Sequence, residues 1–358
     1  MAETFALDSL VLPGTYVQVR AEALIAGAAV STGNIGIVGT ASSVPTVTEI
    51  LSGYDDALNA FGAYDAFAGG AGAQNLTRGI ELAYRNGAGV MFARALADGA
   101  GQSDYTAAFE QLLKDDVNIF VAPQLPTADA LAVFGSVLEE AENNGKDVMA
   151  VVGTDKTDVA DIAAEVPDND RIIFVAPGIQ AYDSAEKDMV TLPATYTAAA
   201  VAGLLSTLVP QSSPTNKVLP GVPGLAERFT YGQEKTLVQD RVLVLEQRGG
   251  VRVVRGLTTD SGAFRQITTR RITDYAKAGM RAVSNPFIGR LNNARVRKAL
   301  NGAINGFLSA MVADEALISY ELAVTASRAD EIAGRAIVNA ILRPTFSIDF
   351  VAVTLTLE

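Results

Sequence analysis

The sequence predicts an α/β fold: a mostly parallel sheet domain with flanking helices, then a C-terminal α+β domain, with extended β-strand arms at both termini. Three observations lead to this prediction. Apolar strand-like segments alternate with amphipathic helices from residue 35 to about residue 209. The pattern changes after a proline-rich stretch, and short β-like segments stand at both ends of the chain. With 358 residues, 49% of them hydrophobic, the chain can bury a sizeable core and form more than one domain.

The first part of the chain carries the alternation. Candidate strands cover residues 35–40, 90–95, 117–122, 148–152 and 172–176, and candidate helices cover residues 76–84, 105–113, 128–141, 159–164 and 194–208. Apolar strands separated by helices of this length indicate a parallel sheet that is covered on both faces. We therefore assign residues 21–209 to an α/β domain.

Prolines at positions 210, 214, 220 and 223 mark residues 210–224 as a linker, and the C-terminal α+β domain is predicted to span residues 225–345. In that domain, the β-like segments 241–246 and 251–255 are joined by Gly249-Gly250, which indicates a hairpin. A long helix is predicted from Pro286 to about Val312, because its apolar residues recur at helical spacing and proline is tolerated in a first turn.

Both termini contain short β-like segments that flank the predicted domains and are predicted to form extended arms. The N-terminal arm, residues 1–20, contains Tyr16, Val17, Val19 and Arg20. The C-terminal arm, residues 346–358, contains Phe346, Ile348 and Phe350 on one parity and Val351, Val353, Leu355 and Leu357 on the other. A single flat strand would expose one of these two sets, so we expect a bulge or a change of sheet between them.

Composition excludes much enzyme chemistry. The chain has no cysteine and no histidine, so Cys/His zinc sites, thiol nucleophiles and imidazole catalysis are impossible. A carboxylate site for Mg²⁺ or Ca²⁺ is still compatible with the composition. No long apolar run or basic-apolar leader is present, which predicts a soluble protein that assembles in the cytoplasm without direct membrane insertion. We predict no catalytic residue, cofactor or metal.

Three motifs with possible chemistry favour plainer interpretations. Glycines at positions 33, 36 and 39 lie before and within a strand, whereas a dinucleotide loop needs them after it. Gly145-Lys146 lacks the remaining residues of a P-loop and is typical of a helix end. Asp155 and Asp158 follow a predicted strand and form the best candidate for a ligand site, although such acidic clusters are more often turns or helix caps.

Charge is distributed unevenly along the chain. Residues 1–170 carry a net charge of −17 and residues 171–358 carry +5, within an overall charge of −12. Residues 275–313 contain six basic residues and no acidic one. An acidic protein is a poor general partner for nucleic acid, so no nucleic-acid binding is predicted. The basic face around Arg290, Arg295, Arg297 and Lys298 is predicted to contact an acidic neighbour or tube.

The order of several segments resembles the sheath proteins of contractile tails. In the first half these segments are residues 33–41, 53–57, 61–62, 76–88 and 90–94. In the second half, residues 241–246, 250–259, 264–271, 288–296 and 344–350 resemble the sheaths of phage-like extracellular contractile injection systems. The resemblance covers most of the chain, which is short for a phage sheath and therefore matches a minimal form without extra outer domains.

This resemblance implies a structural role. Sheath subunits stack as six-membered rings in a helix around an inner tube, and their terminal arms add strands to the C-terminal domains of neighbours. Contraction starts at a baseplate, uses energy stored in the extended lattice and drives the tube through a target envelope. The implied partners are other copies of the chain, the tube protein, and the baseplate and terminal cap proteins.

Two alternatives remain at the level of sequence. Strand–helix alternation is also the pattern of doubly wound enzymes and ligand-binding proteins, for which Asp155–Asp158 would be the site. A non-contractile shell subunit would also polymerise but would not shorten.

Overall fold

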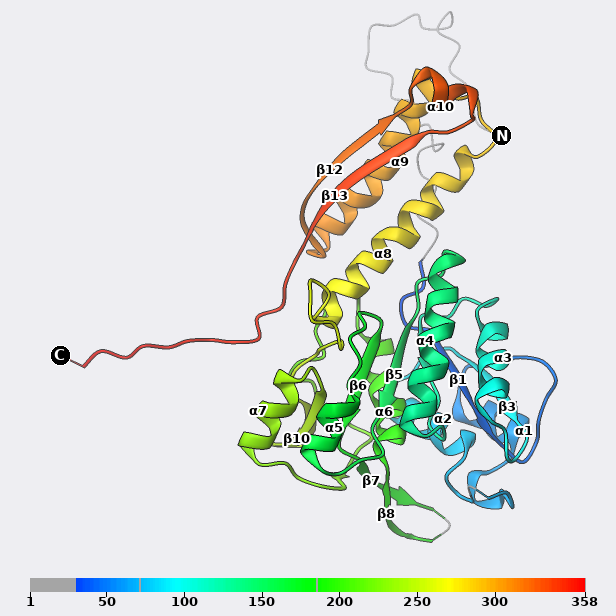
Figure 1. The fold of residues 1–358 in the computed structure, drawn as a ribbon, viewed down its shortest axis with the longest axis vertical. Helices are drawn as coiled ribbons and strands as arrows, with labels where there is room; N and C mark the ends of the chain where they lie inside the picture. Colours follow the sequence, from blue (N-terminus) through cyan, green and yellow to red (C-terminus); the bar gives the residue numbers. More distant parts are fainter. Residues whose placement is uncertain (1–29, 71, 185, 358) are drawn as a thin grey trace, which may run out of the picture.

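The computed structural model describes residues 30–70, 72–184 and 186–357. It consists of a broad α/β body and a narrower C-terminal layer that extends from one end of the body (Figure 1). An eight-stranded sheet forms the centre of the body, in the order β11-β10-β6-β5-β4-β1-β3-β2. The prediction of a mostly parallel sheet with flanking helices is confirmed, because β10, β6, β5, β4, β1 and β3 pair in parallel and only the edge strands β2 and β11 are antiparallel.

The strands of this sheet are β1 (Ile35–Thr40), β2 (Glu49–Leu51), β3 (Met91–Leu96), β4 (Ile119–Val121), β5 (Met149–Gly153), β6 (Ile172–Ala176), β10 (Leu243–Gln247) and β11 (Val251–Val253). The central strands are buried on both faces, which explains why they read as continuous apolar runs in the sequence.

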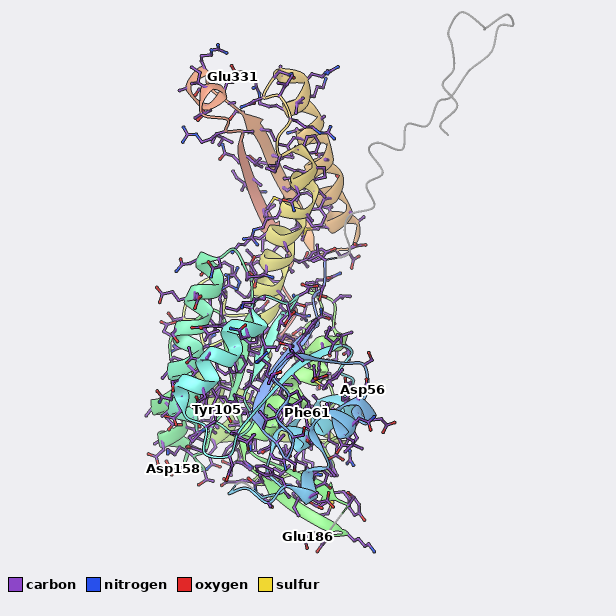
Figure 2. All side chains as sticks on the ribbon, turned by 90° about the vertical axis from the view of Figure 1, so that its right-hand side faces the viewer. Asp56, Phe61, Tyr105, Asp158, Glu186 and Glu331 are labelled. Atoms are coloured by element: carbon purple, nitrogen blue, oxygen red, sulfur yellow. The ribbon has the colours of Figure 1, made fainter. Side chains whose placement is uncertain are left out.

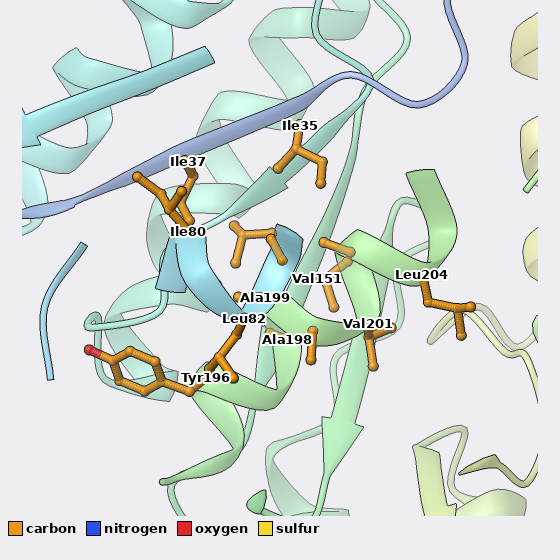
Figure 3. Packing of buried hydrophobic residues seen from close by; sticks show 14 of the residues in the cluster. Ile35, Ile37, Ile80, Leu82, Val151, Tyr196, Ala198, Ala199, Val201 and Leu204 are labelled. Carbon is orange, nitrogen blue, oxygen red and sulfur yellow. The ribbon is translucent and has the colours of Figure 1, made fainter. Parts of the chain in front are cut away.

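Helices cover both faces of the sheet. One face is packed by α1 (Tyr54–Phe61), α2 (Leu76–Arg85) and α6 (Ala194–Thr207), and Figure 3 shows Ile80 of α2 near Ile37 of the sheet. The other face is packed by α3 (Gln102–Leu112), α4 (Thr127–Asn143), α5 (Val159–Glu165) and α7 (Tyr231–Gln239). The central layer of this second face contains Phe109, Phe120 and Phe134, whose rings lie within 6.4 Å of one another.

Close backbone contacts require glycine at two positions. A Cβ at Gly203 of α6 would collide with the carbonyl oxygen of Ala83 in α2, and a Cβ at Gly153 would collide with the carbonyl oxygen of Ala194. Helix α6 therefore approaches both α2 and the end of β5 (Met149–Gly153) more closely than a larger residue would allow.

A small three-stranded sheet lies at the far end of the body, in the order β8-β7-β9, formed by β7 (Ile179–Asp183), β8 (Asp188–Leu192) and β9 (Gly224–Leu225). The short helix η3 (Tyr64–Ala66) lies beside it, and the Tyr64 hydroxyl lies 2.8 Å from Ser184 Oγ. Figure 2 shows Glu186, in the β7–β8 turn, and Glu331, in the C-terminal layer, at opposite ends of the molecule.

The predicted boundary between the two domains, at residues 210–224, is not where the structure changes from the body to the C-terminal layer. The segment 210–224 does not separate two domains, because Leu219 and Val222 are buried and Leu219 N donates to Val251 O beside β11. The β10–β11 hairpin is confirmed, but β10 pairs in parallel with β6 and so extends the large sheet. The chain leaves this sheet only after Val253. Prolines here mark an irregular segment along the sheet edge.

The C-terminal layer contains α8 (Ile267–Ser284), the short helix η4 (Asn285–Phe287), α9 (Ala294–Ala313), β12 (Leu317–Thr325), α10 (Arg328–Ile332) and β13 (Ile337–Pro344). The predicted helix start at Pro286 was wrong: Pro286 lies in η4, Gly289 has a φ of 81°, and α9 begins after Asn293. The Asn293 side chain caps α9 by accepting a hydrogen bond from Val296 N.

Candidate assembly surfaces

The C-terminal layer has its own small core between two helices and a hairpin. Ile272 and Ala276 of α8 face Ile304 and Leu308 of α9, and all four side chains are buried. The rings of Tyr275 and Phe307 lie 5.6 Å apart and extend this core. The packing fixes the β12–β13 hairpin on one side of the helix pair (Figure 1).

The hairpin is an isolated two-stranded sheet among the described residues. Its antiparallel register runs from Leu317 opposite Pro344 to Thr325 opposite Ile337. Tyr320, Leu322, Val324 and Leu342 pack against the helices. Among the described residues each strand pairs only with the other, so its outer edge presents backbone N–H and C=O groups to which another strand can be added.

A groove of about 410 Å³ lies between α8 and β13. Its apolar lining comes from Met280, Ile304, Val338 and Ala340, and its polar lining comes from Lys277, Arg281 and Ser284. A strand added to β13 on this side would place alternate side chains into the groove. The groove and the β13 edge therefore form a candidate acceptor, here called the β13 groove.

The C-terminal segment extends away from the body as an irregular chain (Figure 1). Its large apolar side chains are at least 60% exposed: Phe346, Ile348, Phe350, Val351, Val353, Leu355 and Leu357. No strand forms in residues 345–357, so the predicted C-terminal strand is not formed within one described subunit. The predicted N-terminal arm residues Tyr16, Val17, Val19 and Arg20 lie outside the described residues.

The predicted basic face separates into two kinds of residue. Arg297 is occupied within its own subunit, because its Nη1 lies 3.0 Å from Glu331 Oε1 and 2.9 Å from Asn292 Oδ1. Arg290 stacks over the ring of Phe287, and Arg295 and Lys298 are exposed. These last three make no ion pair with any described residue, so their charges are available to another molecule.

An ion-pair cluster joins α8 to the body. Arg171, at the start of β6, reaches Asp147 and Asp274 at 3.2 Å each, and Arg270 reaches Asp170 at 2.7 Å. Burial of Asp147 opposes its ionisation, but hydrogen bonds from Lys277 and Arg281 outweigh burial and lower its pKa. The cluster fixes the angle between the C-terminal layer and the sheet.

Next to this cluster, Arg271 of α8 is buried and donates to the carbonyl oxygens of Thr32 and Leu208. Burial lowers its pKa to about 10. A cavity of about 130 Å³ lies beside it, lined in part by Asn118 and Tyr275. Arg271 thus attaches the start of the described chain to the same helix that carries the C-terminal layer.

Two models of sheath domains match the chain. The model for the phage tail sheath protein central domain matches residues 98–259, and the model for the phage tail sheath C-terminal domain matches residues 259–358. Together they cover most of the sequence. The chain belongs to the phage tail sheath family. Sheath proteins are structural, so this sheath protein is a structural subunit of a contractile phage tail or phage-like particle and not an enzyme.

Solved structures share the fold. A chain of the contracted helical sheath of the anti-feeding prophage has a TM-score of 0.76 at 17% identity, with 98% of the sheath protein and 100% of that chain covered. A chain of the contracted sheath complex of PVC, an extracellular contractile injection system, has a TM-score of 0.73 at 16% identity, with 98% of both chains covered. A sheath tail protein from Desulfitobacterium hafniense has a TM-score of 0.68 at 15% identity, and the match covers 93% of the present chain and all of the D. hafniense chain. No curated protein matches the sequence.

The carboxylates proposed for a ligand site have structural roles in the sheath protein. Asp158 caps α5 by accepting hydrogen bonds from Ala160 N and Asp161 N, and Asp155 lies 3.0 Å from the ammonium group of Lys156. In the described part of the chain, no acidic cluster is arranged to hold a metal ion. Within the same part, no helix has the length and apolar character needed to cross a membrane.

Sequence reasoning missed the β13 groove. Its lining residues come from α8, α9 and β13, and α8 had not been predicted. The alternation of Val338 and Ala340 in a strand before the C-terminal segment was the available signal, but the sequence alone did not show that their face would be left partly open.

Proposed function

We propose that this sheath protein polymerises as stacked six-membered rings around an inner tube, in a lattice whose contraction drives the tube through a target envelope. Energy stored in the extended lattice powers the movement, so no nucleotide or cofactor is required. The proposed partners are other copies of the chain, the tube protein, and baseplate and terminal cap proteins. Assembly takes place in the cytoplasm of the producing cell.

One observation carries this proposal: a single subunit contains both an exposed apolar strand-like segment and a strand edge with an open apolar groove. The segment 351–357 alternates apolar residues, and the β13 groove offers an unpaired edge. They do not occupy each other in one subunit (Figure 1). A donor and an acceptor that are separate in one chain can join successive copies without closing, which generates a helical assembly.

The arms and the basic residues have separate proposed roles. The C-terminal arm is proposed to add a strand to the β13 groove of a neighbour, and the N-terminal arm with Tyr16, Val17, Val19 and Arg20 is proposed to add a strand to another copy. Arg290, Arg295 and Lys298 are proposed to contact the tube or a neighbouring sheath subunit, because they are exposed and make no ion pair with any described residue. Arg297 is proposed to support them by holding α10 against α9.

Negative-stain electron microscopy of the purified full chain tests the proposal. We compare it with a variant that lacks residues 351–358 and with a variant in which Thr354 and Thr356 are alanine. The full chain and the alanine variant are expected to form hollow, ring-stacked tubes, and the truncated chain is expected to remain dispersed. Closed shells from the full chain would favour a non-contractile shell subunit. Tubes from the truncated chain would refute the role of the C-terminal arm.

A further inference from the structure

The C-terminal segment is attached to its own subunit at one point before it becomes free. The side chain of Asp349 is 5% exposed, although its neighbours Ile348 and Phe350 are 82% and 78% exposed. Asp349 Oδ2 lies 2.8 Å from Arg255 Nε and 3.2 Å from Gln266 Nε2. Thr215 Oγ1 donates to Asp349 Oδ1 at 3.4 Å. We call this set of contacts the Asp349 clasp.

Two further contacts support the clasp. Ser347 N and Ser347 Oγ each lie 3.3 Å from Gln266 Oε1, and the guanidinium group of Arg255 lies 5.0 Å from the centre of the Phe350 ring. Charge-assisted hydrogen bonds to a shielded carboxylate are among the stronger polar contacts in proteins. The clasp therefore fixes residues 347–350 on the start of α8 and the end of β11.

The clasp also accounts for the change of parity in the C-terminal segment. Ser347 and Asp349 face the body, whereas Phe346 and Ile348 are largely exposed and Phe350 touches the body only through Arg255. Val351 and Leu355 have the same parity as Ser347 and Asp349, but they lie beyond the last clasp contact. The segment thus has two parts: residues 346–350 stay with their own subunit, and residues 351–357 form the donor strand.

A donor strand so close to β13 has a competing partner in its own subunit. Residues 345–350 are a short enough connection for a hairpin, and residues 351–357 reach roughly 23 Å at about 3.3 Å per residue. That length would cover most of β13 (Ile337–Pro344). When a short loop joins two strands of one chain, each strand meets the other at an effective concentration of about a millimolar. Pairing of the donor strand with β13 of its own subunit (self-pairing) would therefore compete strongly with pairing to a second copy.

We propose that the Asp349 clasp prevents this self-pairing: it holds the chain against Arg255 and Gln266, directs the donor strand away from its own β13 groove and so makes a second copy the acceptor. The inference rests on the strand addition proposed above. Asp349 is a positioning residue, because it acts on where the donor strand lies and does not itself contact the neighbour.

Disulfide trapping tests the inference, because the chain has no cysteine of its own. Ala340→Cys marks the β13 groove, and Val353→Cys, Leu355→Cys or Leu357→Cys marks the donor strand in three separate registers. Each pair is made in the parent chain, with Asp349→Ala, and with Gln266→Ala, which removes partners of both Ser347 and Asp349. Glu139→Ala, an exposed carboxylate on α4, controls for the loss of charge.

After mild oxidation, non-reducing gels separate interchain from intrachain disulfides. We expect mainly interchain products in the parent and in Glu139→Ala, and a several-fold increase of the intrachain product in Asp349→Ala and Gln266→Ala. Mixing chains that carry only the groove cysteine with chains that carry only the donor cysteine identifies the interchain product. Circular dichroism confirms that each variant is folded.

The outcomes separate the inference from the proposed function. An interchain fraction that is the same in the parent and in both clasp variants would overturn the role of the clasp while supporting strand addition. The absence of either disulfide in all three registers and in every background would overturn strand addition itself, and the inference with it.

Discussion

Asp147 Oδ2 lies 2.6 Å from Nη1 of Arg281, and this ion pair joins the loop before β5 to α8. The same carboxylate lies 2.5 Å from Lys277 Nζ and 3.2 Å from Arg171 Nη2. One buried acidic side chain therefore contacts cations from the sheet and from the C-terminal layer. Because the two parts of the subunit meet at this carboxylate, it is the most informative position for testing how firmly they are joined.

Replacing Asp147 with alanine is expected to lower the free energy of unfolding by about 3 kcal/mol, because it leaves the buried Arg171 with one partner fewer. Urea unfolding of the subunit measures this change. Glu139→Ala removes an exposed carboxylate on the neighbouring helix and is expected to change stability by less than about 0.5 kcal/mol. Equal effects of the two substitutions would show that the cluster does not stabilise the junction.

The cluster also predicts a pH dependence. The pKa of Glu142 is lowered by its hydrogen bond to Arg171, and the pKa of Asp147 is lowered because hydrogen bonds from Lys277 and Arg281 outweigh burial. Carboxyl groups with a lowered folded pKa add stability above their unfolded pKa of about 4, and this stability is lost as the pH falls through the folded pKa. Burial raises the pKa of Asp274, so that group acts in the opposite direction.

Asp147→Asn is therefore expected to be less stable than the parent at neutral pH but to lose less stability on acidification below about pH 4. Urea unfolding over a series of pH values measures how the free energy of unfolding of each protein depends on pH. Parallel pH profiles for the two proteins would contradict the assigned shift of Asp147.

Glycine substitutions in two helices should have opposite effects. Gly203→Ala is expected to destabilise the subunit by about 2–3 kcal/mol, because the new methyl group meets the backbone of α2. Gly302 on α9 has open space around it, so Gly302→Ala is expected to stabilise the subunit by about 0.5–1 kcal/mol through helix propensity. Thermal unfolding measures both, and a destabilising Gly302→Ala would contradict the packing described for α9.

Charge reversal tests the exposed basic residues. The double variant Arg295→Glu and Lys298→Glu is expected to weaken tube or sheath assembly strongly, and added salt should weaken assembly of the parent. Lys235→Glu on α7 provides the control, since Lys235 is exposed and α7 lies in the body, away from α9 (Figure 1). Sedimentation of assemblies with and without the tube protein measures the effect, and equal assembly by all three proteins would remove these residues from the contact.

Much of the body could be predicted because its elements obey local rules. Strands such as Ile35–Thr40 are buried on both faces and are continuously apolar, and helices such as Leu76–Arg85 show helical spacing. By contrast, α8 opens with β-branched residues and two buried arginines, Arg270 and Arg271, so neither propensity nor periodicity indicated a helix. Arg270 forms an ion pair with Asp170, a hundred positions earlier in the chain, and Ile272 and Ala276 pack against α9, so the contacts of this helix are not local in sequence.

The candidate assembly surfaces were only partly predictable. Apolar alternation identified residues 346–357 as strand-like, but strand pairing requires a partner that one subunit does not supply. Asp349 looked like an ordinary polar residue in an alternating segment. Its role depends on Arg255 and Gln266, which lie more than eighty positions away, and no local pattern relates them.

The position of the Asp349 clasp has a mechanical consequence. A neighbour that holds residues 351–357 and moves would transmit its pull along the chain to Asp349 before the force reached Pro344. The load would then pass through Arg255 and Gln266 into the edge of the large sheet and the base of α8. The β12–β13 hairpin, which could otherwise be peeled open one hydrogen bond at a time, would carry little of that force.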